Sequence, residues 1–304
     1  MPSNPLVSIL INNYNYGRFI QEAISSALAQ SYGPVEVVVV DDGSTDNSRA
    51  VIASFGNRVV PVLKQNGGQA SAFNAGFAAC KGEIICFLDS DDLFAPDKVT
   101  EIVKIYGENP QIGWCFEKMV LFDHNSGERH SDASGYTLGL WDARKALAAG
   151  RPPHIATATS GISFRRTTLE RILPMPESIR ITSDGFLKLA ALALIPGWNA
   201  VEGLTLQRIH GENLYTGRKD GKKRQVGKLG ILIAAALADR FPDLKRLEIV
   251  LFSRGLGLCW ISGGFDSECR HLTRTFLGKL PILNRTEVVL RAVYSGARNL
   301  NRPA

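Results

Sequence analysis

The amino-acid sequence predicts an α/β fold with a Rossmann-like, mostly parallel sheet flanked by helices. In the first third of the chain, short β-branched runs alternate with helix-length stretches, which is the order of βαβ units. Two of the expected strands end in clusters of carboxylates, within residues 41–46 and 89–92. Because ligands bind outside the carboxyl ends of the strands in such sheets, we expect these loops to contribute to one nucleotide-binding site.

The first half of the chain gives the clearest pattern. A polar loop over residues 12–18 follows the first expected strand, and we expect Ser44 or Thr45 to cap the second helix and Gly82 to end the third. The expected strands cover residues 6–11, 35–40, 59–63 and 83–88, and the expected helices cover residues 19–30, 47–55, 70–80 and 97–106.

The second half is less regular. Strands are expected at residues 113–122, 157–164 and within 200–209, with helices at 141–149 and 185–193 and a hairpin tip or mobile loop at 124–136. Beyond Leu214 the composition changes to a basic segment followed by helices. We therefore predict a domain over residues 1–214 and a helical C-terminal extension over residues 215–304.

Composition narrows the class of protein. The 304 residues are 45% apolar and 21% charged, which is typical of a globular protein. A net charge of +6 suits nucleotides, phosphates or an anionic membrane surface but is too small to indicate nucleic-acid binding. Five scattered cysteines without metal-ligand spacing indicate reduced thiols. We expect a cytoplasmic protein without a signal peptide or membrane-spanning segment.

Three carboxylates directly follow the apolar strand over residues 83–88. Asp89, Asp91 and Asp92 cannot all be buried without a counter-charge, so they must lie at the exposed end of that strand. Such a cluster suits a hard cation, Mn²⁺ or Mg²⁺, together with bound phosphates. The alternative is a polar loop or a helix N-cap. The convergence of several polar strand ends at one edge of the sheet favours the cation site.

Six segments in a fixed order make the chain similar to the inverting glycosyltransferases of family 2, which have the GT-A fold. Two departures are Asn12, where proline or threonine is usual, and Ser183, where an acid is common. The resemblance covers residues 6–213 and is carried by Val7 to Asn15, Val40 to Asp46, Asn66-Gly67-Gly68 with Asn74-Ala75-Gly76, Asp89 to Asp92, Ser183-Asp184 and Arg208 to Asn213.

The resemblance implies a nucleotide-diphospho-sugar donor, with a UDP-sugar favoured, and a divalent cation that stabilises the departing diphosphate. Asp91 is the expected metal ligand, and Asp89 is expected to contact both metal and ribose. Asp92 either completes or orients the metal shell, or caps the following helix. His210 is either a further metal or diphosphate contact or a structural hydrogen-bonding residue.

Inversion requires a base that takes the proton of the acceptor hydroxyl, and Asp184 is the candidate. The alternative for Asp184 is an N-cap of the helix that follows, and the two roles are compatible. Either Asp41 or Asp42 is expected to accept the imide N–H of the base, and Tyr14 or Tyr16 to stack on it. The remaining residues assigned to nucleotide binding are Asn12, Gln69, Asn74 and Ser90.

The acceptor is expected to be a saccharide or a lipid-linked saccharide in surface polysaccharide synthesis. Residues 273–304 mix six basic with many apolar side chains, so this region is either a helix that contacts the inner face of the membrane or a solvated basic face. Two rival functions are a nucleotidyltransferase, which would need a basic glycine-rich loop that residues 12–17 lack, and a degenerate sugar-nucleotide-binding protein.

Overall fold

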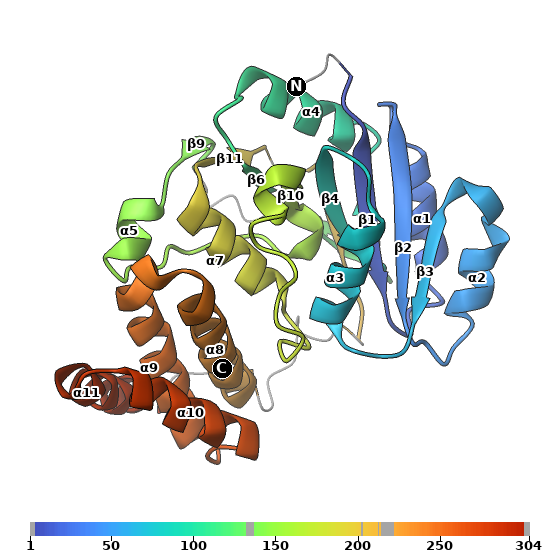
Figure 1. The fold of residues 1–304 in the computed structure, drawn as a ribbon. Coiled ribbons are helices and arrows are strands. Elements are labelled where there is room, and N and C mark those ends of the chain that lie inside the picture. The colour runs from blue at the N-terminus through green and yellow to red at the C-terminus, as the bar shows by residue number, and fades with distance from the viewer. Residues whose placement is uncertain (1–3, 132–136, 202, 212, 214–221, 301–304) are drawn as a thin grey trace. The chain divides into compact units, whose positions relative to one another are not determined.

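The computed structural model describes all residues except 1–3, 132–136, 202, 212, 214–221 and 301–304 (Figure 1). The chain divides into two compact units, which we describe separately. The first contains residues 1–142 and 154–212, and the second contains residues 143–153 and 213–304. The predicted boundary between residues 214 and 215 lies outside the described residues, and the prediction did not assign residues 143–153 to the C-terminal part.

The first unit contains an eight-stranded sheet with the order β3-β2-β1-β4-β10-β6-β11-β9. Its parallel half consists of β3 (Val60–Lys64), β2 (Val35–Asp42), β1 (Val7–Asn13) and β4 (Ile84–Asp89). Antiparallel β10 (Ile162–Arg165) joins this half to β6 (Trp114–Glu117) and β11 (Gly197–Ala200), and β9 (Gly139–Trp141) forms the edge. This confirms the predicted α/β fold with a mostly parallel sheet.

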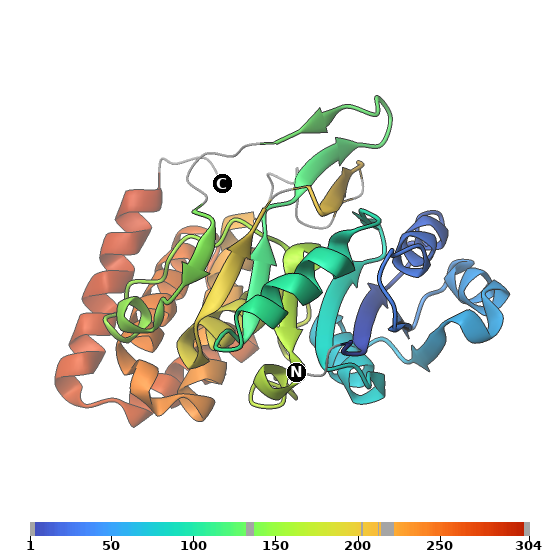
Figure 2. The same ribbon diagram turned by 90° about the horizontal axis from the view of Figure 1, so that it is seen from above.

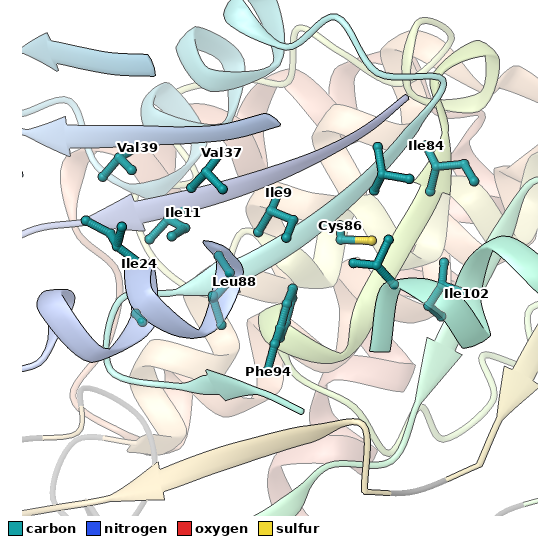
Figure 3. Packing of buried hydrophobic residues seen from close by; sticks show 14 of the residues in the cluster. Ile9, Ile11, Ile24, Val37, Val39, Ile84, Cys86, Leu88, Phe94 and Ile102 are labelled. Carbon is teal, nitrogen blue, oxygen red and sulfur yellow. The ribbon is translucent and has the colours of Figure 1, made fainter. Parts of the chain in front are cut away.

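Helices cover the parallel strands because both faces of these strands are apolar. On one face, Ile9, Ile11, Val37 and Val39 pack with Ile24 of α1 (Ile20–Leu28), as Figure 3 shows. The other face is covered by α3 (Gln69–Ala79). α2 (Ser48–Ser54), η1 (Gly56–Arg58) and α4 (Lys98–Glu108) complete the first half of the unit.

α3 approaches the sheet closely because its residue 76 is a glycine. A Cβ atom at Gly76 would lie 2.8 Å from the Val40 side chain and 2.9 Å from that of Leu10. These distances are shorter than van der Waals contact, so any larger residue would push the helix away from β1 and β2. The position of the N-terminal end of α3, beside the carboxyl ends of the strands, therefore depends on this glycine.

A second sheet has the order β5-β12-β7-β8. It consists of β5 (Leu93–Phe94), β12 (Thr205–Ile209), β7 (Val120–Asp123) and β8 (Arg129–His130), and Figure 2 shows it beside the main sheet. Because β12 pairs with β5, which directly follows the acidic stretch, the end of β12 is brought to residues 89–92. η2 (Thr159–Gly161), α6 (Arg166–Leu169) and α7 (Asp184–Leu194) complete the unit.

Several predicted elements differ from those observed. The expected strand at 113–122 is two strands in different sheets, β6 and β7. The strand expected within 200–209 is confirmed as β12, whereas β11 was not expected. The expected strand at 157–164 starts only at Ile162, after η2. Ser44 does not cap α2, because its hydroxyl contacts Asn13 and Asn15 and Asp46 accepts the Ser48 N–H instead. α3 ends at Ala79, with Cys80 as its C-cap residue rather than Gly82.

The second unit is helical. It contains α5 (Arg144–Ala148), α8 (Lys222–Arg240), η3 (Pro242–Leu244), α9 (Lys245–Ile261), α10 (Ser267–Lys279) and α11 (Ile282–Asn299). Its core includes Ile231 of α8, Phe252 of α9, and Phe276 of α10, whose ring stacks on that of Phe252 at 3.9 Å. Among the helices of the described residues, none is both long and apolar enough to cross a bilayer.

Candidate active site

The site is built at the carboxyl edge of β1, β2 and β4. Asn12 lies opposite Asp89 in the register of β1 and β4, and Asn13 lies opposite Asp41 in the register of β1 and β2. The parallel arrangement therefore brings the polar ends of these three strands together, as the sequence predicts. Asn12 Nδ2 donates to Asp89 Oδ1 at 2.9 Å, and Asn13 Nδ2 donates to Asp41 Oδ2 at 3.0 Å.

An acidic cluster follows β4. Asp89, Asp91 and Asp92 can each bring one carboxylate oxygen to within 4.8 Å of the others. Asp92 is buried, and the Asp91 side chain is 13% exposed. Burial and the neighbouring Asp91 raise the pKa of Asp89 to about 7, although a hydrogen bond from Asn12 opposes the shift. Burial and the charges of Asp91 and Asp89 also raise the pKa of Asp92 well above its usual range.

Two residues orient this cluster: Ser160, which the sequence did not single out, and Arg208, which begins one of the segments that carry the family resemblance. The Ser160 hydroxyl donates to Asp92 Oδ2 at 2.6 Å and accepts the Asp89 backbone N–H at 2.9 Å. Arg208 is almost fully buried; its backbone N–H donates to Asp92 Oδ1 at 2.9 Å, and its Nε donates to the Asp91 carbonyl at 2.9 Å. Both residues therefore fix which way the Asp92 carboxylate points, and each also holds the backbone of a neighbouring aspartate. Glu22 forms an ion pair with the Arg208 guanidinium at 2.7 Å.

His210 contacts the cluster through Asp91. Its Nε2 lies 3.1 Å from Asp91 Oδ2, and its Nδ1 lies 3.3 Å from Nη2 of Arg18. A guanidinium only donates hydrogen bonds, so Nδ1 accepts and the proton is assigned to Nε2, which donates to Asp91. His210 also packs on the Phe19 ring at 4.6 Å. This geometry supports a positioning role, and direct binding of metal by His210 stays a prediction.

The carboxylates at the end of β2 each have a basic partner and backbone N–H partners. Asp41 accepts from Arg49 Nε at 2.8 Å and from the Ser44 N–H at 3.1 Å. Burial alone would raise the pKa of Asp41, but these hydrogen bonds outweigh it and hold the pKa below its usual range. Asp42 accepts from Lys64 Nζ at 2.7 Å and from the backbone N–H groups of residues 67 and 68, at 2.9 and 2.7 Å.

The other residues predicted to bind nucleotide lie around these strand ends. Tyr14 is 45% exposed in the loop after β1, and Ser90 is buried with its N–H toward the Asn12 carbonyl at 3.3 Å. Gln69 accepts the Ser183 N–H at 2.8 Å and so links α3 to the start of α7. Asn74 Nδ2 donates to the Met175 carbonyl at 2.9 Å, and Asn74 Oδ1 accepts the Met175 N–H at 2.8 Å. These two bonds hold the backbone at Met175, so the Asn74 side chain has a structural role.

Asp184 is buried in the first turn of α7, where its charge helps to raise the pKa of Asp89. Gln69 links the start of α7 to η2, because it accepts the Ser183 N–H and donates to the Thr159 hydroxyl at 3.4 Å. The fold thus connects Asp184 with the residues beside Ser160, although it lies 95 positions after Asp89 in the chain. Lys188, one helical turn later and almost fully buried, donates from Nζ to Asp184 Oδ2 at 2.7 Å and to the Thr157 carbonyl at 2.6 Å. Lys188 therefore contacts one carboxylate oxygen of Asp184, Oδ2, and does not contact the other, Oδ1.

Sequence reasoning missed Ser160 and Lys188 for different reasons. Ser160 lies in a stretch of small residues without a local pattern, and only the fold brings it to Asp89 and Asp92. Lys188 had a local signal, because it lies four positions after Asp184 on an otherwise apolar helix. A lysine on a buried helical face is a reason to look for a carboxylate one turn away.

A divalent cation fits the acidic cluster. Three carboxylates within reach of a common point are the oxygen-rich set that Mg²⁺ and Mn²⁺ prefer. Burial, and then the repulsion among the carboxylates, raises the pKa values of Asp89 and Asp92, so negative charge is unfavourable in the metal-free cluster. A cation would relieve that repulsion. The observed geometry is thus compatible with the predicted ligands Asp89, Asp91 and Asp92.

A helix-flanked, mostly parallel sheet with an acidic cluster at its carboxyl edge defines a protein of the GT-A class. Two solved structures share the fold. One is TarS (residues 1–349) of S. aureus in complex with UDP-GlcNAc, with a TM-score of 0.64, 18% identity, and coverage of 97% of this chain and 89% of that one. The other is the mannosyltransferase PcManGT of Pyrobaculum calidifontis with GDP-Man and Mn²⁺, with a TM-score of 0.52, 18% identity, and coverage of 98% and 88%.

Sequence comparisons are more specific. The family model of glycosyl transferase family 2 matches residues 8–173. An uncharacterized glycosyltransferase of Nostoc sp. is 35% identical over 231 residues, which are 73% of this chain and 70% of that protein. A chondroitin synthase of Pasteurella multocida is 48% identical over 103 residues, 33% of this chain but only 11% of the synthase. The chain therefore belongs to glycosyltransferase family 2.

Proposed function

We propose that the protein is a metal-dependent inverting glycosyltransferase that moves a sugar from a nucleotide-diphospho-sugar to a hydroxyl group of an acceptor. The observation that carries the proposal is the juxtaposition of two kinds of carboxylate. Asp89, Asp91 and Asp92 form a crowded cluster, and Asp184 is near enough to influence the pKa of Asp89 but is held by a lysine of its own. One group suits a cation, and the other suits a base.

Asp91 is the proposed principal ligand of Mn²⁺ or Mg²⁺, with Asp89 and Asp92 completing the site. When bound, the cation would stabilise the negative charge that develops on the departing nucleoside diphosphate. Ser160 and Arg208 hold Asp92, and His210 holds Asp91, so the ligands are oriented before the cation arrives. Such orientation by outer partners is usual in metal sites.

Asp184 is the proposed catalytic base. Its Oδ1 takes the proton of the acceptor hydroxyl while the acceptor oxygen bonds to the anomeric carbon from the face opposite the leaving group. The anomeric C–O bond to the diphosphate breaks, and its electron pair leaves with the nucleoside diphosphate. Lys188 keeps Asp184 in place through Oδ2 and is itself anchored on the Thr157 carbonyl. Lys188 is therefore a positioning residue rather than a proton acceptor.

A UDP-sugar is the favoured donor. Asn12 supports a nucleotide contact at the end of β1, because its Oδ1 is buried without a hydrogen-bond partner among the described residues and can accept from a ribose hydroxyl. One of Asp41 and Asp42 is the proposed acceptor of the imide N–H of the base, and hydrogen bonds hold both carboxylates at the end of β2. TarS with UDP-GlcNAc is compatible with a UDP-sugar, whereas PcManGT with GDP-Man favours an alternative base.

We further propose a saccharide or lipid-linked saccharide acceptor, in the synthesis of a surface polysaccharide, on the cytoplasmic side of the membrane. The support is the 48% identity to a stretch of the chondroitin synthase and of the hyaluronan synthase of Pasteurella multocida, over 103 residues in each case. Because that stretch is 11% of either synthase, we use it to support the kind of reaction and not to assign the glycosidic linkage that is formed.

The test is the release of nucleoside diphosphate from a panel of nucleotide-sugars, with and without Mn²⁺, by the wild type, Asp91→Ala and Asp184→Ala. We expect Mn²⁺-dependent release that both substitutions abolish, and full activity in Asp243→Ala, whose carboxylate is exposed in η3. Donor binding without release from any donor would instead support the degenerate sugar-nucleotide-binding protein. Unchanged release in Asp184→Ala would refute the assignment of the base.

A further inference from the structure

α11 exposes apolar side chains along its whole length. Seven large apolar residues in this helix and directly after it are between 46% and 84% exposed. The opposite face of α11 is used within the second unit, where Val288, Ala292 and Gly296 are buried and the helix packs against α9 (Figure 1). The exposed residues are Ile282, Leu283, Val289, Leu290, Val293, Tyr294 and Leu300.

These residues form one continuous arc around the helix axis. An α-helix turns by about 100° per residue, so the seven residues, together with Thr286 and Ala297, fall within an arc of roughly 140°. No charged residue lies inside this arc. A contiguous apolar face of this width on a helix whose other face is already packed is the pattern of a helix that lies on an apolar surface.

Arginines flank the arc on both sides. On the same projection, Arg298 and Arg291 lie along one edge together with Glu287, and Arg285 lies along the other. Arg285 and Arg298 are exposed. The single acidic residue of the helix, Glu287, is engaged by Arg246 and Arg291 at 2.6 Å each. The edges of the apolar face are therefore net positive.

We propose that this face of α11, the apolar arc with its arginine edges, binds an anionic membrane surface. The helix would lie parallel to the surface, with the apolar arc among the acyl chains and the arginines at the level of the lipid phosphates. Tyr294 suits the same boundary, since its ring is apolar and its hydroxyl is polar. The charge pattern disfavours a second copy of the chain as the occupant, because pairing through this face would bring arginine edges against arginine edges.

The test is co-sedimentation of the full chain with vesicles, without donor or metal, so that the result is independent of glycosyl transfer. We expect binding to vesicles that contain phosphatidylglycerol, weaker binding to vesicles of phosphatidylcholine alone, and a loss of binding as salt rises. Leu290→Glu should weaken binding roughly tenfold or more, because it removes one fully inserted apolar side chain and adds a like charge to the anionic surface. Arg298→Glu should weaken the additional binding that phosphatidylglycerol gives and leave binding to phosphatidylcholine vesicles unchanged.

Two matched substitutions in the first unit control for net charge alone. Gln111→Glu and Lys104→Glu make the same charge changes at exposed positions and should bind as the wild type does. Leu283→Glu provides a second variant on the arc, and thermal melting checks that each variant is folded. The proposal is overturned if the wild type does not bind anionic vesicles or if Leu290→Glu and Leu283→Glu bind normally. A dimer in sedimentation velocity that Leu290→Glu dissociates would assign the face to self-association instead.

Discussion

The two acidic strand ends of the sheet look alike in sequence and differ in the structure. At the end of β2, each carboxylate has a basic partner, Arg49 for Asp41 and Lys64 for Asp42, and further N–H donors. At the end of β4, the Asp89 carboxylate accepts from the Asn12 amide, the Asp92 carboxylate accepts from the Ser160 hydroxyl and the Arg208 backbone N–H, and Asp91 lies close to both. The pKa of Asp41 is accordingly lowered, whereas the pKa values of Asp89 and Asp92 are raised.

This difference separates two uses of a buried carboxylate. The pair after β2 is electrically complete and serves to hold loops: Asp42 fixes the backbone of residues 67 and 68, and Asp41 fixes Asn13 and residue 44. We propose that the cluster after β4 has an excess of negative charge, which a bound divalent cation would offset. Substitutions after β4 should therefore lower activity without lowering stability, whereas substitutions after β2 should lower stability.

The largest effect is expected from Asp91→Ala. Loss of the principal cation ligand should lower kcat/KM by about 100- to 1000-fold, because charge stabilisation of the leaving group is lost. Since the substitution removes a carboxylate whose charge disfavours ionisation of Asp89 and Asp92, it should not lower the melting temperature of the metal-free protein. Steady-state release of nucleoside diphosphate and thermal melting measure the two quantities. A variant that unfolds more easily would contradict the proposed charge excess.

Lys188→Met should reduce kcat by about 10- to 100-fold and leave the KM for the donor nearly unchanged. The buried methionine fills similar space but no longer holds Asp184 Oδ2, so the base loses its orientation. Lys188→Arg should recover part of the rate, because a guanidinium can reach the same oxygen. Equal losses in kcat and in donor affinity would show instead that Lys188 only supports the fold.

Arg49→Met tests the end of β2, where each carboxylate has a basic partner. Removing the partner of the buried Asp41 should cost about 1–2 kcal/mol of folding free energy, an amount limited because Arg49 is itself nearly half exposed. The loss should be the same with and without Mn²⁺, since we place no cation at this end. Denaturant unfolding measures it, and a Mn²⁺-dependent loss would assign Asp41 to the metal site.

A further effect, which follows from a single pKa, is a change of stability with pH. The pKa of Asp89 in the folded protein is about 7, above its ordinary value of 3.8, so the folded state holds a proton that the unfolded state has released. Stability of the metal-free protein should therefore fall as pH rises from about 4 to about 7. Asp89→Asn should flatten this dependence in thermal melts. Mn²⁺ should stabilise the wild type more above pH 7 than below it, and an equal gain at both would contradict the assignment.

Particular residues show what the sequence could predict. Asn13, Asp41 and Asp89 were predictable as neighbours because β-branched runs identify parallel strands, and parallel strands end at one edge. Ser160 was not predictable, because its contacts to Asp89 and Asp92 span about 70 positions and no local pattern marks them. The change of sheet between Glu117 and Val120 has no composition signal either, so two strands were predicted as one.

The division of the chain has a consequence for how the protein is made. Residues 143–153 belong to the second unit, yet they precede β10, α7 and β12 of the first. α5 packs against α9, and Leu147 is fully buried. During synthesis α5 leaves the ribosome about a hundred residues before its helical partner, so the second unit can close only after the first has been translated. Truncation after residue 213 would leave α5 without the partner that covers Leu147.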